Sequence, residues 1–236
     1  MNRMPFILES KYGKVTHKRE DSLFVIGERI NPSSNPMVLS ALRQDENDSL
    51  LKEAEEQVRC GAQAIDVNVG VGHDQAECMR KTVRYIQERL KVPLVLDSAR
   101  PEVLKAGLEE SGGRVLLNSI TGEERSLRTL IPLARKYQVP FVGLTIDEKG
   151  LPQTHTERLH IADKIVTAAL AAGIPKEDIV IDPVLLPVSF YPDQVFETLK
   201  ALKSLREAGV TWTCLGISNV SFGLKKRKEV NLAPLI

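Results

Sequence analysis

The sequence repeats one unit, a short apolar run that ends in a polar residue and is followed by a segment with helical periodicity. The runs are apolar at successive positions, which is typical of strands buried on both faces of a parallel sheet covered by helices. Seven such units are predicted from the N-terminus to the C-terminus. The residues that end the runs are Asn31, Asn68, Asp97, Asn118, Thr145, Asp182 and Asn219. This alternation predicts an α/β protein.

The first strand is predicted at Leu23–Ile26, and the last at the run Cys214–Ile217, which stops at Ser218-Asn219. Helices are predicted between the runs from helical spacing, capping residues and Gly or Pro at the expected ends. Their approximate ranges are 49–61, 75–90, 101 onward, 123–137, 156–172 and 193–209.

Two architectures fit this alternation, an open doubly wound sheet and a (β/α)8 TIM-type barrel. The first strand-to-helix turn has no G-x-G-x-x-G, which weakens a dinucleotide-binding sheet. Polar residues end nearly every strand instead of clustering at one crevice, and this favours the barrel, whose C-terminal mouth collects them. We expect an N-terminal hairpin or cap in residues 1–22 and a barrel in residues 23–236. Residues 220–236 are too few for a complete eighth βα unit.

Bulk composition excludes several classes of protein. The net charge of +1 offers no electrostatic argument for nucleic acid or a membrane surface. Cys60, Cys78 and Cys214 are few and far apart, which fits reduced thiols in a cytoplasmic protein. His155 and His160 are five positions apart and do not share a helical face, so no metal site is predicted.

The polar residues at the strand ends are carboxylates and carboxamides, with no histidine or cysteine among them. A carboxylate accepts two adjacent N–H groups of an amino-pyrimidine, and a carboxamide donates and accepts at once. The set therefore suits a neutral heterocycle, and it suits phosphates poorly because lysine, arginine and glycine loops are missing there. The alternative is that each Asp or Asn merely starts a loop or caps a helix.

Taken together, several motifs resemble the pterin-binding methyltransferases, and most closely methyltetrahydrofolate:corrinoid/iron–sulfur protein methyltransferase and related corrinoid methyltransferases. The resemblance covers about Leu23 to Phe222. The motifs are Gly27-Glu28-Arg29-Ile30-Asn31, Asp66-Val67-Asn68-Val69-Gly70, Leu96-Asp97-Ser98, Asn118-Ser119, Ile181-Asp182-Pro183 and Gly216-Ile217-Ser218-Asn219-Val220-Ser221-Phe222.

This resemblance implies a barrel enzyme that binds 5-methyltetrahydrofolate in its mouth and transfers the N5-methyl group to Co(I) of a corrinoid (cobalamin) on a partner protein. By motif, it assigns pterin binding to Asp97, Asn118 and Asp182, and contact with pterin N5 to Asn219. Asn31, Asn68 and Thr145 are further rim candidates, and Arg227 matches a family arginine eight positions beyond the asparagine. A homodimer is implied by the resemblance alone.

Two other readings of the residues stay open. A dihydropteroate synthase has a similar pterin pocket, but carries a basic Ser-Arg-Lys-type segment where this chain has Ser218-Asn219-Val220. A non-catalytic pterin-binding remnant is the second alternative, because the eighth βα unit is incomplete.

Overall fold

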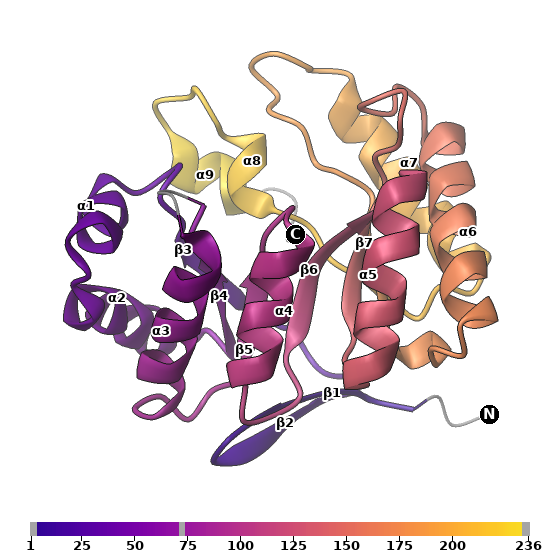
Figure 1. Ribbon diagram of the computed structural model, residues 1–236. Coiled ribbons are helices and arrows are strands. Elements are labelled where there is room, and N and C mark those ends of the chain that lie inside the picture. The colour runs from indigo at the N-terminus through magenta and orange to yellow at the C-terminus, as the bar shows by residue number, and fades with distance from the viewer. Residues whose placement is uncertain (1–3, 71–73, 233–236) are drawn as a thin grey trace. The chain divides into compact units, whose positions relative to one another are not determined.

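The computed structural model describes residues 4–70 and 74–232, with the α/β alternation that the sequence predicts (Figure 1). The chain divides into two compact units. Unit 1 comprises Met1–Ser119 and Leu133–Phe141, and unit 2 comprises Ile120–Pro132 and Val142–Ile236. In the described residues, strands β3 to β9 are hydrogen-bonded in chain order in one seven-stranded sheet. The chain thus has the parallel α/β fold of the TIM-barrel type, with a separate N-terminal hairpin.

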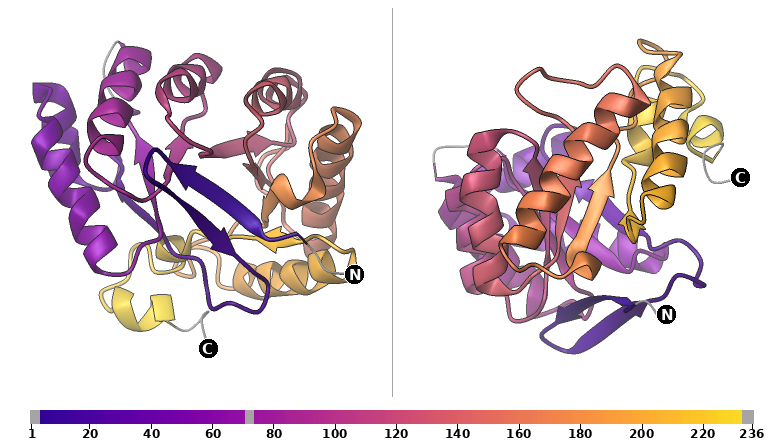
Figure 2. Two further views of the ribbon diagram at one scale, coloured as in Figure 1. Left: turned by 90° about the horizontal axis from the view of Figure 1, so that it is seen from below. Right: turned by 90° about the vertical axis from the view of Figure 1, so that its right-hand side faces the viewer.

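Unit 1 opens with the predicted hairpin, β1 (Phe6–Ser10) and β2 (Gly13–His17), paired antiparallel. Its contacts go to segments that precede strands of the sheet. Glu9 N–H donates to the Arg114 carbonyl at 2.8 Å, the Arg114 guanidinium donates to the Ile7 carbonyl, and the Tyr12 hydroxyl donates to the Glu88 carbonyl. The hairpin (indigo in Figure 2) therefore lies at the amino-terminal ends of the unit 1 strands, opposite the strand ends that carry polar residues.

The rest of unit 1 is a run of parallel βα units. Its elements are β3 (Ile26–Ile30), α1 (Pro36–Gln44), α2 (Asn47–Arg59), β4 (Ala64–Asn68), α3 (Gln75–Gln87), β5 (Leu94–Asp97), α4 (Pro101–Glu110) and the first part of β6 (Leu116–Thr121). Figures 1 and 2 show α2, α3 and α4 side by side along one face of β4 and β5. Fully buried side chains such as Ile65, Leu96 and Leu104 fill the space between the helices and the strands.

The first sheet strand was predicted three residues too early. Leu23 and Val25, part of the apolar run, are exposed, and β3 begins at Ile26. In the described sheet β3 has β4 as its neighbour on one side only, so the strand tolerates polar residues such as Glu28. A side chain at Gly27 would displace Gln57, because a Cβ at this position would lie 2.6 Å from its Oε1.

Helix α1 was not predicted, although its start carries two ordinary signals. Asn35 caps the helix with its side-chain oxygen, which accepts the backbone N–H groups of Met37 and Val38, and Pro36 occupies the first turn.

Unit 2 continues the alternation. Its elements are the end of β6, the first part of α5 (Glu124–Tyr137), most of β7 (Phe141–Leu144), α6 (His155–Ala171), the 3-10 turn Lys176–Asp178, β8 (Ile179–Asp182), α7 (Gln194–Glu207), β9 (Trp212–Thr213), α8 (Ile217–Val220) and α9 (Arg227–Leu232). Helix α6 packs on α7 and β8 (Figure 2). A capping box formed by Thr154 and Glu157 fixes where α6 begins.

The prediction of a buried strand at Cys214–Ile217 was wrong. Strand β9 ends at Thr213, and Ile217 already begins α8, a single helical turn. Asn219 therefore projects from a short helix and not from the end of a strand. Residues 233–236, part of the segment predicted to be too short for an eighth unit, lie outside the described residues. Among the described helices, none combines the length and apolar character that crossing a membrane requires.

Candidate functional site

Three of the predicted residues lie at one level of neighbouring strands in unit 1. Asn68 on β4 is the register partner of Asp97 on β5, and Asp97 is the register partner of Asn118 on β6. Partners across parallel strands carry their side chains to the same face, so an acid is flanked by two amides. The Asn68 amide donates to Oδ2 of Asp97 at 2.8 Å, while Oδ1 of Asn68 accepts the Gly70 N–H.

A second acid, Asp66, completes this cluster and was not among the predicted site residues. It lies two residues before Asn68, so the strand period places both side chains on the same face of β4. Its side chain is buried, and its Oδ2 accepts a hydrogen bond from the Asn118 amide at 3.0 Å. We refer to Asp66, Asn68, Asp97 and Asn118 as the acid–amide row.

Electrostatics favour a proton on the two acids of the row. Burial raises the pKa of Asp66 well above its usual range, and the neighbouring charge of Asp97 raises it further. Burial also raises the pKa of Asp97, to which the charge of Glu28 adds, while the hydrogen bond from Asn68 opposes the shift. Two acids this close do not both ionise readily. The pair therefore keeps a proton at a pH where an isolated aspartate has lost its own.

Replacing Asp66 with asparagine is expected to flatten the dependence of stability on pH. The pKa of Asp66 is raised on folding, so above pH ~4 the folded state retains a proton that the unfolded state has lost. The free energy of unfolding of the native chain therefore falls as pH rises from about 4 toward the folded pKa. The amide introduced by Asp66→Asn would stay neutral and keep an acceptor for Asn118.

Urea unfolding of both proteins between about pH 4 and 8 measures this difference. We expect the variant to gain stability relative to the native chain as pH rises through this range. Parallel stability profiles for the two proteins would contradict the buried, proton-holding role of Asp66.

In unit 2, Asp182 and Thr145 meet through the backbone. Asp182 is the last residue of β8, and its carbonyl accepts both the N–H of Thr145, at 3.0 Å, and its hydroxyl, at 3.1 Å. Oδ1 of Asp182 accepts the N–H of Val184 at 2.8 Å. The hydroxyl of Thr145 is fully buried and already bonded, so Thr145 supports the end of β8.

The other predicted residues occupy different settings. Asn219 is exposed on α8, and the Arg227 guanidinium supports this turn by donating to the Ser221 hydroxyl at 3.1 Å and to the Ser218 carbonyl at 3.2 Å. Asn31 forms a turn in which its Oδ1 accepts the N–H of Ser33, as expected for a loop-starting asparagine.

Cys214 is a half-buried cysteine of unit 2 that forms no disulfide. Burial raises its pKa well above the usual range, and the charge of Asp182 adds to the shift. The thiol therefore stays protonated, which removes its nucleophilic form.

The structure thus joins Asn68 with Asp97 and Asn118 with Asp66 in unit 1, and Thr145 with Asp182 in unit 2. Asp66 and Glu28, whose charge raises the pKa of both acids of the row, were not among the predicted site residues. An acid inside the otherwise apolar run Ala64–Val69, two positions before a polar strand end, was the available signal for Asp66.

Curated relatives match this chain over most of its length. It is 29% identical over 229 residues to "Methionine synthase" of Mycobacterium tuberculosis (strain ATCC 25618 / H37Rv), covering 92% of this chain and 19% of the relative. It is 28% identical over 214 residues to "Methylcorrinoid:tetrahydrofolate methyltransferase" of Eubacterium limosum, covering 89% of this chain and 78% of the relative. The chain thus spans about a fifth of the methionine synthase and most of the methyltransferase.

Solved structures share the fold at low sequence identity. A dihydropteroate synthase of Xanthomonas albilineans, solved with indole-2-carboxylic acid and 6-chloroguanine, superposes with a TM-score of 0.69 at 17% identity and covers 98% of this chain and 87% of that one. A dihydropteroate synthase of Coxiella burnetii, in complex with pteroic acid, gives 0.68 at 16% identity and covers 97% of this chain and 87% of that one. The sequence model for "Pterin binding enzyme" matches residues 27–234. The chain belongs to the family of pterin binding enzymes.

Proposed function

We propose that the chain transfers the N5-methyl group of 5-methyltetrahydrofolate to Co(I) of a corrinoid carried by a partner protein. The observation that carries this proposal is the acid–amide row, an acid flanked by two amides with a second acid buried behind them. The name of the Eubacterium limosum relative describes methyl transfer from a methylcorrinoid to tetrahydrofolate, which is the reverse of this reaction, and it supports the proposal. A site that lowers the activation barrier for methyl transfer in one direction also lowers it for the reverse reaction.

The row has the chemistry that a pterin ring requires. The pyrimidine edge of a pterin presents a ring N–H beside an exocyclic amino group, and one carboxylate accepts both. Asp97 would accept these two donors, and the Asn118 amide would bind a ring acceptor. The Asp182 carboxylate, whose Oδ1 accepts the N–H of Val184, is assigned to the same ring by its motif.

In the reaction, the bond between the methyl carbon and N5 breaks and a bond between that carbon and cobalt forms. The electron pair of the broken bond stays on N5, so the reaction needs a proton from solvent or a hydrogen-bond donor at that nitrogen. Asn219 would donate from its amide to N5 and strengthen this bond in the transition state. The acceptor on the partner is the nucleophile, so the chain itself supplies binding, orientation and the donor at N5.

Two other functions make different demands on the chain. Pteroate synthesis releases pyrophosphate and calls for cations that bind the leaving group, whereas the Arg227 guanidinium at the Ser218–Asn219 turn donates to the Ser221 hydroxyl and the Ser218 carbonyl. The likeness to dihydropteroate synthases, at 16–17% identity, concerns the fold. A non-catalytic pterin-binding protein would keep the acid–amide row without turning over a methyl donor.

An assay with 5-methyltetrahydrofolate and free cob(I)alamin tests the proposal. We expect the cobalt absorbance to change as methylcobalamin forms, in proportion to the amount of protein. Incorporation of p-aminobenzoate into pteroate would establish the synthase reading instead. Pterin binding by titration calorimetry without methyl transfer, in a folded sample, would establish the non-catalytic reading.

A further inference from the structure

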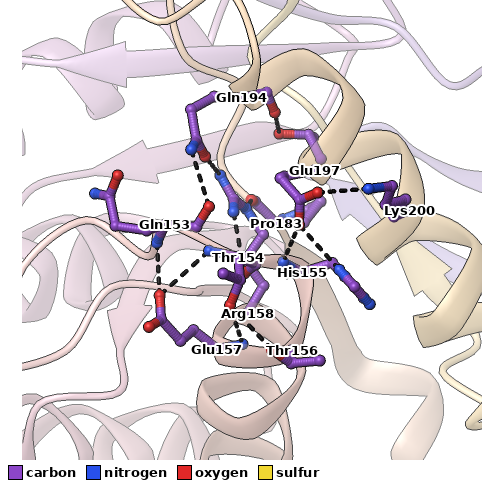
Figure 3. A network of polar contacts seen from close by, with 11 residues as sticks. Gln153, Thr154, His155, Thr156, Glu157, Arg158, Pro183, Gln194, Glu197 and Lys200 are labelled. Carbon is purple, nitrogen blue, oxygen red and sulfur yellow. Dashed lines mark hydrogen bonds and ion pairs between the residues drawn. The ribbon is translucent and has the colours of Figure 1, made fainter.

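Arg158, in the second turn of α6, is the largest fully buried side chain among the described residues. Its Nε donates to the Pro183 carbonyl at 2.8 Å, Nη1 to the Thr154 carbonyl at 3.1 Å, and Nη2 to Oε1 of Gln194 at 2.9 Å (Figure 3). All three acceptors are neutral oxygens. Burying a guanidinium is unfavourable, and ordinary helix–helix packing does not require one. Packing alone therefore does not explain why an arginine is buried at position 158.

The segment that Arg158 contacts is an unusual turn. Val184 has φ of 61°, a left-handed conformation that a β-branched residue rarely adopts. This turn directly follows Asp182, whose Oδ1 accepts the N–H of Val184. The orientation of the Asp182 carboxylate therefore depends on whether the turn keeps this conformation. A conformation of this kind persists only where surrounding contacts enforce it.

Three consecutive carbonyls of the turn are each bound by a fully buried polar side chain. The Asp182 carbonyl accepts the Thr145 hydroxyl, the Pro183 carbonyl accepts Arg158, and the Val184 carbonyl accepts the Thr198 hydroxyl at 2.9 Å. Thr145, Arg158 and Thr198 each have 0% exposed surface. They come from the end of β7, from α6 and from α7, so separate elements converge on three residues of backbone. We name these three side chains the turn clamp.

We propose that Arg158 is a positioning residue that, with the rest of the turn clamp, holds the Asp182 carboxylate in the orientation that binds the pterin. This inference rests on the proposed pterin-binding role of Asp182. The same helix junction has a second polar group that does not touch the turn. Glu197 accepts the backbone N–H of His155 and contacts its ring and Lys200 (Figure 3). Its charge raises the pKa of Arg158 against the effect of burial, so Glu197 is not independent of the guanidinium.

The test is a double-mutant cycle on pterin affinity, measured with 5-methyltetrahydrofolate by titration calorimetry. Arg158→Met keeps a long apolar stem and removes the guanidinium. We expect about a tenfold loss of affinity in the native background, and less than a twofold loss when Asp182→Asn is already present. The thermal midpoint should fall in both backgrounds, because the lost hydrogen bonds contribute to folding in each. Lys164→Met makes a similar change at a surface cation of α6 that pairs with Glu148, and it should leave affinity unchanged.

Thr198→Val removes only a hydroxyl from the turn clamp. It is expected to shift affinity in the same direction as Arg158→Met and to show the same dependence on Asp182. This milder variant decides the question if Arg158→Met does not fold. An equal loss of affinity in both backgrounds, or no loss in the native one, would overturn the positioning role. If Asp182→Asn alone binds as tightly as the native chain, the proposed role of Asp182 fails, independently of Arg158.

Discussion

Replacing Asn219 with alanine is expected to lower the methyl-transfer rate by about 10²–10³-fold, the usual effect of losing one preorganised transition-state donor. The affinity for 5-methyltetrahydrofolate should change much less, because the bond to N5 strengthens only as the methyl group departs. Single-turnover rates with cob(I)alamin and calorimetric dissociation constants separate the two effects. Because the Asn219 side chain is exposed, we expect its removal to change the free energy of unfolding by no more than about 0.5 kcal/mol.

Ser218→Ala is the matched control for this experiment. It alters the neighbouring residue on α8 but retains the backbone carbonyl that accepts the Arg227 guanidinium. The rate of this variant should stay close to that of the native chain. Rate and affinity falling in step after Asn219→Ala would show that Asn219 contributes ordinary binding and has no special role at N5.

Replacing Asp97 with asparagine is expected to weaken pterin binding by about 10- to 100-fold. A hydrogen bond to a charged group contributes about 1.5–3 kcal/mol, and about 1.4 kcal/mol corresponds to tenfold in affinity. The amide would also direct an N–H toward the N–H donors of the ring. Because the variant loses the charge that faces Asp66, we expect it to fold at least as stably as the native chain. Titration calorimetry and a thermal melt on the same sample measure both quantities.

Asp45→Asn provides the same chemical change at the surface of unit 1. Asp45 pairs with Lys81, and its φ of 57° is one that asparagine tolerates. Its affinity for the pterin should match that of the native chain. Unchanged affinity after Asp97→Asn would remove the acid–amide row from the proposed site.

The parts of the fold that the sequence predicted are those in which local pattern and tertiary environment agree. Strands β4, β5 and β8 are buried on both faces, and each ends at its predicted polar residue. Asn68 and Asp97 end their strands as predicted, whereas Asn118, also predicted to end a strand, shares their register although β6 continues to Thr121. The helix start at Pro101 follows from a proline at the first helical position, and the start near Thr154 coincides with a capping box.

The errors arise where the deciding contact is remote in sequence. Asp66 lies inside an apolar run and not at its end, and its partner in the site is Asn118, 52 positions away. Asn219 was expected at a strand end because its run is apolar, but β9 ends at Thr213 and α8 begins at Ile217. The turn clamp depends on three side chains from separate elements, and no local signal connects them.

The raised pKa values of Asp66 and Asp97 make ligand binding depend on pH as well as on ligand concentration. A heterocycle that donates N–H groups to Asp97 stabilises the ionised form of this acid and lowers its pKa. Binding of the heterocycle to the acid–amide row then favours release of a proton from its acids, and loss of that proton favours binding of the heterocycle. The measured heat of binding will include the ionisation heat of whichever buffer takes up that proton. Affinity will rise with pH until the pair has already given up its proton in the empty protein.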